Sequence, residues 1–171
     1  MTKAVYGIVA THPEAASLIE NLRKGGFSTT DVSVLAPHNQ QQVGLQVEKH
    51  TKSLEGTATG ATAGGVLGGV LGLLAGIGTV VIPGLGILVA AGPLLATLSG
   101  MGIGASVGGL AGGLIGIGIP EYEAKLYEGH LEKGGILVAV HCEDTETVSR
   151  AHEIMQSAGA TDIATSREKA A

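Results

Sequence analysis

Sixty-five consecutive residues, from 56 to 120, carry no acidic, basic or histidine side chain. This segment holds 21 of the 29 glycines in the chain. In water, a glycine inside a helix makes that helix less stable by about 1 kcal/mol than an alanine does. Inside a lipid bilayer, unpaired backbone groups are so unfavourable that a helix forms even where glycine is frequent. The segment therefore favours a structure that is sheltered from water.

The glycines of this segment recur at every fourth position in two rows, which mirror each other about position 88. An antiparallel helical hairpin that turns near position 88 places the two rows at matching depths. Because glycine lets two helix backbones approach closely, we predict that the rows form a glycine-zipper packing surface. The predicted packing residues are Gly60, Gly64, Gly68, Gly72, Gly76, Gly100, Gly104, Gly108, Gly112 and Gly116. The predicted hairpin turn contains Pro83, Gly84, Gly92 and Pro93.

The two predicted helical arms, residues 57–82 and 93–118, have 26 residues each. A rise of about 1.5 Å per residue makes each arm roughly 39 Å long, and the hydrocarbon core of a bilayer is ~30 Å thick. Each arm is therefore long enough to cross a membrane. The tip, residues 83–93, has no charge and little polarity. A hairpin that dips into the bilayer, one that fills the interior of a protein shell, and a buried soluble core remain alternatives.

The two flanks carry all 25 acidic and basic residues and resemble parts of an ordinary soluble domain. In each flank, a helix pattern lies between two short strand patterns. The predicted strands are residues 3–10, 31–35, 136–140 and 162–165, and the predicted helices are residues 14–26 and 143–157. Two such units predict an α+β, ferredoxin-like βαββαβ sandwich, in which two helices cover one face of the sheet. The apolar hairpin is inserted between the second and third strands, which are neighbours in this topology.

Helical periodicity assigns an inward face to each predicted helix. These faces contain Ala15, Leu18, Ile19 and Leu22 in the first helix and Val148, Ala151, Ile154 and Met155 in the last. A short amphipathic helix is also expected, with Tyr122, Leu126 and Leu131 on or near one face. The chain accordingly divides into a first βαβ half (1–38), a polar linker (39–55), the glycine-rich helical hairpin (56–119), the amphipathic helix (120–134) and a second βαβ half (135–171).

The residue pattern does not indicate a catalytic, cofactor-binding or metal-binding site. His12, His141 and Cys142 most suggest a metal, but the first and third strands of the predicted sheet are antiparallel neighbours, so His12 lies at the opposite end from the other two. The chain has no Cys-x-x-Cys, no His-x-x-x-His and no glycine loop followed by Gly-Lys-Ser/Thr. His130 and His152 are expected to be isolated on their helices. We therefore predict no catalytic residue, no cofactor and no metal ligand.

Charge and the N-terminal sequence bear on partners and location. The net charge of −5 and the lack of a basic run argue against nucleic acid as a partner. The N-terminus has no long apolar region of the secretory signal type. The single cysteine, Cys142, fits a reducing compartment. We expect a membrane protein whose folded flanks lie on the cytoplasmic side.

Several segments resemble a family of small bacterial membrane proteins related to heat-induced general stress proteins. The matching segments are residues 5–9, the helix 14–26, the Gly/Ala-rich hairpin, and residues 119–127 leading to 134–138. The block from Ile119 to Tyr127 is the most specific of these. The resemblance covers most of the chain and implies a two-span membrane protein. It assigns no catalytic residue to this sequence. The layout is more distantly similar to the two-span accessory subunit of alternative complex III, whose Trp-rich spans this chain lacks.

Together these observations predict a non-enzymatic, membrane-inserted structural protein of the bacterial stress response that assembles with copies of itself. Its expected partners are further copies of the chain and membrane lipid. Two alternatives remain open at this point. One is a membrane-tethered sensor that binds a small ligand or metal, and the other is an accessory subunit of a larger membrane complex.

Overall fold

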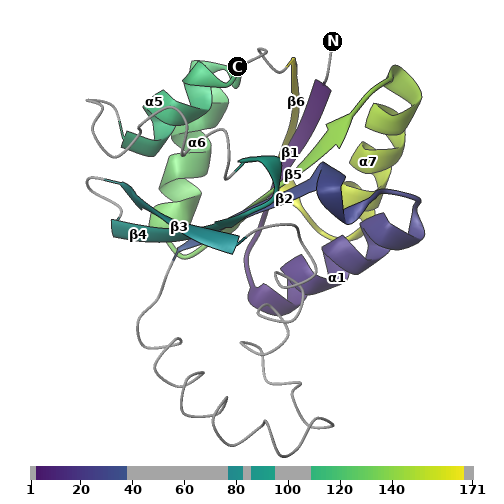
Figure 1. The fold of residues 1–171 in the computed structure, drawn as a ribbon, viewed down its shortest axis with the longest axis horizontal. Helices are drawn as coiled ribbons and strands as arrows, with labels where there is room; N and C mark the ends of the chain where they lie inside the picture. The colour runs from purple at the N-terminus through teal and green to yellow at the C-terminus, as the bar shows by residue number, and fades with distance from the viewer. Residues whose placement is uncertain (1–2, 38–76, 83–85, 95–108, 168–171) are drawn as a thin grey trace, which may run out of the picture.

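The computed structural model describes residues 3–37, 77–82, 86–94 and 109–167 (Figure 1). The predicted linker 39–55 lies outside these described residues, as do most of the predicted packing glycines and part of the predicted turn. The residues concerned are Gly60, Gly64, Gly68, Gly72, Gly76, Gly100, Gly104 and Gly108 of the two rows, and Pro83 and Gly84 of the turn.

The described residues form an α+β fold around one antiparallel sheet. Its strands are β1 (Lys3–Val9), β2 (Val32–Pro37), β3 (Ile77–Ile82), β4 (Gly86–Ala91), β5 (Ile136–Cys142) and β6 (Thr161–Arg167). They are ordered β3-β4-β2-β5-β1-β6, and each strand is antiparallel to its neighbours. The pairing of β5 with both β1 and β2 is the one predicted for the strands of the two flanks.

Helices accompany the sheet on both sides in the described part of the chain. They are α1 (His12–Lys24), the short 3₁₀-helix η1 (Thr29–Asp31), α5 (Gly109–Gly116), α6 (Glu121–Glu132) and α7 (Thr145–Ser157). The start of α1 is fixed by a capping box, in which Thr11 and Glu14 each accept a hydrogen bond from the other's backbone N–H. Asp144 and Thr147 form the same arrangement at the start of α7. These bonds satisfy N–H groups that have no partner within the helix.

The inward faces predicted for the two flank helices are confirmed. All four predicted residues of α1 are buried. In α7, Ala151 and Met155 are buried, while Val148 and Ile154 are partly buried against the same core.

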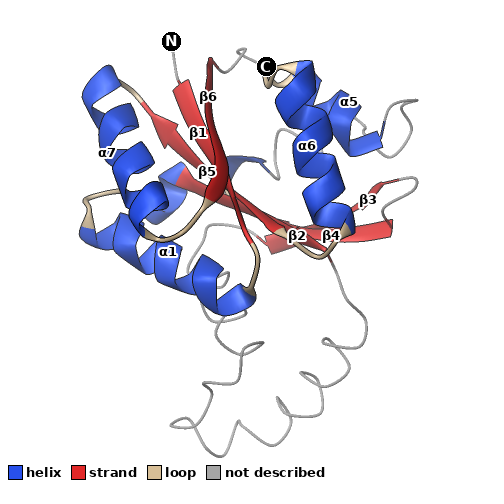
Figure 2. Cartoon of the chain, turned by 180° about the vertical axis from the view of Figure 1, so that it is seen from behind, coloured by secondary structure: helices blue, strands red, loops and turns tan. Residues whose placement is uncertain are grey.

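Both faces of the sheet are covered, whereas the predicted sandwich placed two helices on one face. α1 and α7 pack on one face, and α5 and α6 pack on the other (Figure 2). The physical reason lies in the sequence of β5, where the five residues from Ile136 to Val140 are apolar without alternation and each is 0% exposed. A strand of this kind needs apolar side chains on both of its faces.

The prediction that residues 77–82 and 86–91 belong to a helical arm and its turn is wrong. These residues contribute β3 and β4, an antiparallel pair that joins the sheet beside β2. The two strands are rich in isoleucine and valine, which favour β-structure. The edge of β2 also offers backbone groups that a further strand can satisfy. Gly92 and Pro93 therefore follow the end of β4 and do not turn between two helices.

The last part of the predicted second arm is helical but short. α5 has eight residues and ends at Gly116. The chain then turns back, and Ile117 and Ile119 are buried in the core between α5, α6 and the sheet. Within the described ranges, none of the helices has both the length and the apolar character that crossing a bilayer requires.

The segment 120–134, predicted as an amphipathic helix, contains α6, and Leu131 lies on its inward face as predicted, whereas Tyr122 does not. Ala124, Tyr127 and Leu131 are buried, whereas Tyr122 is 76% exposed. The buried residues are spaced by three and four positions and so lie on one side of the helix. Tyr122 is two positions from Ala124 and therefore lies on another side.

The end of β4 is fixed to β2 by a buried serine. The Ser33 side chain is 0% exposed. Its Oγ accepts a hydrogen bond from the backbone N–H of Leu94 at 3.0 Å and lies 3.1 Å from Nε2 of His141. Gly92 has a φ of +83°, and a Cβ at this position would overlap the carbonyl oxygen of Val32. Glycine is thus required where the chain leaves β4.

Two glycine-to-alanine substitutions should change stability in opposite directions. Gly92→Ala is expected to lower the free energy of unfolding by about 1–3 kcal/mol, because its φ and the nearby carbonyl leave no room for a methyl group. Gly112→Ala should raise it by up to about 1 kcal/mol, since Gly112 lies inside α5 and no atom lies within 4 Å of the added Cβ. Urea denaturation followed by circular dichroism measures both changes. Effects of the same sign would contradict this account.

Candidate functional site

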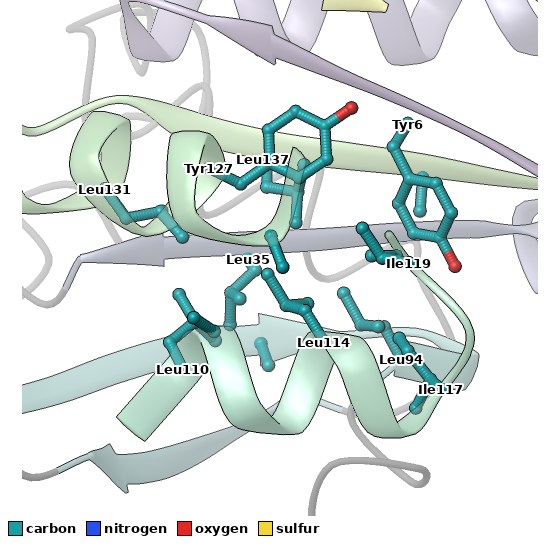
Figure 3. Close-up of a cluster of buried hydrophobic side chains, with 14 of the residues drawn as sticks. Tyr6, Leu35, Leu94, Leu110, Leu114, Ile117, Ile119, Tyr127, Leu131 and Leu137 are labelled. Atoms are coloured by element: carbon teal, nitrogen blue, oxygen red, sulfur yellow. The ribbon is translucent and has the colours of Figure 1, made fainter. Parts of the chain in front are cut away.

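Two of the predicted packing glycines, Gly112 and Gly116, lie in the described part of the chain, on α5. Both are exposed, and Ile115 between them is 39% exposed. Leu110 and Leu114, on the other side of α5, point into the core shared with α6 and the sheet (Figure 3). We call the exposed residues Gly112, Ile115 and Gly116 the α5 glycine face. Since this face contacts no other helix of the described chain, packing against a second copy stays a prediction.

A carboxylate of α6 anchors α5. The backbone N–H of Ala111 donates a hydrogen bond to Oε2 of Glu128 at 2.7 Å. Ala111 lies in the first turn of α5, where N–H groups lack partners within the helix and the helix dipole favours a negative charge. Glu128 thus acts as a cap supplied by another helix. Local sequence patterns do not reveal such a contact, because the two residues are 17 positions apart.

Three polar residues tie α6 to the edge strand β6, and we call them the Asp162 cluster: Tyr127, His130 and Asp162. The hydroxyl of Tyr127 donates to the backbone carbonyl of Asp162 at 2.8 Å. Nε2 of His130 lies 2.7 Å from Oδ2 of Asp162, and each side chain is about one-third exposed. The prediction that His130 is isolated is therefore wrong, because its partner comes from another element, 32 positions away.

Asp162 has an unusual backbone conformation. Its φ of +52° lies in the left-handed region that residues other than glycine seldom adopt. The register between β1 and β6 shifts between Tyr6 and Ile8, so the strand has a local irregularity there. Bulges of this type redirect side chains. Here the carbonyl and the carboxylate of Asp162 both meet α6.

The Tyr127 ring is buried beside Tyr6, and the two ring centroids are 6.4 Å apart (Figure 3). Removal from solvent raises the pKa of the Tyr127 hydroxyl well above its ordinary value of 10.0, and the negative charges of Glu123 and Asp162 raise it further. The hydroxyl therefore keeps its proton in the folded chain and remains a hydrogen-bond donor.

A pocket of about 230 Å³ lies beside the Asp162 cluster. It is lined by Ile8, Ala10, His130, Lys133, Gly135, Gly159 and Thr161. The lining combines apolar surface with an imidazole, an amine and a hydroxyl group. Common ligand pockets have volumes of roughly 300–1,000 Å³, so this pocket suits only a small molecule. The sequence signals that could have indicated it are Gly134-Gly135 and Gly159, which end α6 and α7 at neighbouring points.

The other candidate residues are placed as the sequence predicted. Lys3 lies opposite Cys142 in the β1–β5 register, whereas His12 follows Val9 at the other end of β1. His12 and Cys142 are therefore a strand's length apart. Among the residues that the structure describes, no three His, Cys, Asp or Glu side chains are close enough together to hold a metal ion.

Comparisons with protein-family models, curated proteins and solved structures found no match to this chain.

Tyr127→Phe is expected to change the dependence of stability on alkaline pH. Because the pKa of Tyr127 is raised in the folded chain, the unfolded chain loses this proton first as the pH rises above about 10. The stability is complete below that pH, and above it the free energy of unfolding falls by up to about 1.4 kcal/mol per pH unit through this group. The variant should show a correspondingly shallower fall. At neutral pH it should be about 1 kcal/mol less stable, since the Asp162 carbonyl loses a donor.

Tyr122→Phe is the matched control, because Tyr122 is 76% exposed and its substitution should leave the free energy of unfolding at neutral pH unchanged. Urea denaturation at a series of alkaline pH values measures all three chains. Identical slopes for the parent chain and Tyr127→Phe would show that burial of this hydroxyl does not affect folding.

Proposed function

We propose that this chain is a non-enzymatic structural protein that assembles with copies of itself at a membrane. The observation that carries the proposal is the α5 glycine face, which is exposed and uncharged. Glycine on the outside of a helix permits the close approach of a second helix, and Ile115 adds an apolar contact. The opposite side of α5 is committed to the core of the chain, so the glycine face is the side available to a partner.

The folded flanks provide the scaffold for this assembly, and we interpret them as a ferredoxin-like domain. The order β2-β5-β1-β6, with α1 and α7 on one face, supports a βαββαβ arrangement. The glycine-rich segment is then an insertion between β2 and β5. Because these two strands are neighbours in the sheet, both ends of the insertion leave the domain at adjacent strands.

The membrane part of the proposal rests on the sequence. Residues 56–120 carry no charge, and lipid is the environment in which a glycine-rich helix is favoured. Membrane lipid is therefore a proposed partner, with the folded flanks on the cytoplasmic side. The resemblance to heat-induced general stress proteins extends the proposal to a role in the bacterial stress response.

Bulky residues on the α5 glycine face should reduce self-assembly. A full chain that carries both Gly112→Leu and Gly116→Leu is expected to form a particle of at least about twofold lower mass in mild detergent. The reason is that leucine side chains hold two helix backbones apart. Static light scattering of the purified protein measures the mass.

Gly129→Leu in α6 is the matched control, since Gly129 is also a helical glycine with no atom within 4 Å of an added Cβ. It should leave the mass unchanged. An unchanged mass in the double variant would reject the α5 glycine face as the assembly surface. An equal decrease of the mass in the control would mean that leucine lowers the mass by disturbing the helix that carries it, and not by blocking a contact between copies.

The pocket beside the Asp162 cluster favours a second candidate function, that of a membrane-tethered sensor of a small ligand. Thermal melting of the full chain with a panel of small carboxylates, phosphates and amines tests it. A ligand at a hundred times its Kd should stabilise the chain by about 2.7 kcal/mol. Thr161→Trp, which fills the pocket, should abolish the shift, whereas Thr165→Trp on the same strand should retain it. No shift with any member of the panel would contradict the sensor function.

A further inference from the structure

The two edges of the sheet differ in their protection against further strands. In the described part of the chain, β3 is outermost at one edge and β6 at the other. The outer side of an edge strand presents backbone N–H and C=O groups to which another strand can pair. Proteins usually block such edges with charged residues, bulges or proline.

β6 has such protective features. Asp162 combines a charge with a φ of +52°, and the register of β6 with β1 is irregular at this point. Arg167 places a second charge at the end of the strand, and both residues are exposed. A further strand that approached β6 would therefore meet an irregular backbone and charged side chains.

β3 has none of these features. Its sequence from Ile77 to Ile82 contains no charge and no proline, and every residue except Gly78 is β-branched. All six residues pair with β4 in one continuous register. The outer groups of β3 are thus presented regularly along the whole strand, which is the form of edge that accepts another strand.

We propose that β3 pairs with β3 of a second copy of this chain, antiparallel about a two-fold axis, so that the two sheets become continuous. A two-fold axis perpendicular to the sheet places one residue opposite its own copy, and the strand is compatible with a register centred on Val80. This register pairs Val80 with Val80, Thr79 with Val81 and Gly78 with Ile82. No like charges meet, and pairs of β-branched residues across two strands are favourable.

Symmetry and the protected edge explain why the occupant is a second copy. A two-fold pairing uses the same edge of both chains, so no β3 edge is left free, and the outer edges of the pair are two copies of β6. An open fibre would instead require β3 to pair with β6, which the irregular backbone at Asp162 opposes. The pairing is therefore closed, as in most symmetric dimers.

This inference rests on the proposed self-assembly but uses a surface other than the α5 glycine face. A chain with a blocked edge still has the glycine face, and a chain with a blocked glycine face still has β3. The two surfaces can therefore be tested separately.

Proline substitution tests the edge, because N–H groups of successive residues in an edge strand point alternately inward and outward. The single variants Thr79→Pro and Val80→Pro remove N–H groups on opposite sides of the strand, so one of the two removes an outward N–H group. That variant should melt like the parent chain but form a particle of about twofold lower mass by light scattering in mild detergent. The other should lose pairing with β4 and melt at a lower temperature. Thr79→Lys and Val80→Lys place like charges near the two-fold axis and should also lower the mass.

Thr165→Lys on β6 is the matched control, since Thr165 is exposed on the opposite edge, and it should leave the mass unchanged. A folded proline or lysine variant of β3 that keeps the parent mass would overturn the pairing. If the β3 variants lower the mass and the double leucine variant of α5 does not, the β3 pairing stands and the glycine face is rejected. The reverse result rejects the β3 pairing alone.

Discussion

The central strand β5 constrains the whole described structure, because its residues from Ile136 to Val140 are buried on both faces of the sheet. Its apolar residues on both faces are removed from water, and each face contributes to a separate core. One core is closed by α1 and α7, which belong to the two flanks. The other is closed by α6 together with α5, which comes from the end of the glycine-rich segment. This segment therefore has a role in the fold of the domain besides any role at a membrane.

The second core is held in place by polar contacts that the C-terminal half of α6 makes to α5 and to β6. Glu128 caps α5, and Tyr127 and His130 bind the backbone and side chain of Asp162 at the edge of the sheet. A buried hydroxyl that lacks a partner lowers stability, so these bonds specify where α6 lies as well as stabilising it. The left-handed conformation of Asp162 is explained by the same contacts, since its carbonyl and its carboxylate both meet α6.

The surfaces proposed for assembly follow from how the uncharged segment is divided. One part adds β3 and β4 to the sheet and leaves an edge without charge, and another part forms α5 and leaves glycines on its outer side. Both surfaces consist of groups that gain from a partner, namely backbone groups along β3 and closely approachable backbone on α5. The pocket beside Asp162 lies at the other end of the strand order, away from β3.

Local sequence patterns predicted the strands and helices of the two flanks, the helix α6 and the antiparallel pairing of β1 with β5. The continuous apolar run of β5 also contained a sign that both faces would be covered. Contacts that form only in the folded chain make residues 77–82 and 86–91 strands, place α5 against α6 and give His130 its partner Asp162. The physical reason is that a run of Gly, Val and Ile can form its backbone hydrogen bonds either within a helix or with a neighbouring strand. The choice depends on the open edge of β2, which is distant in the sequence and adjacent only in the folded chain.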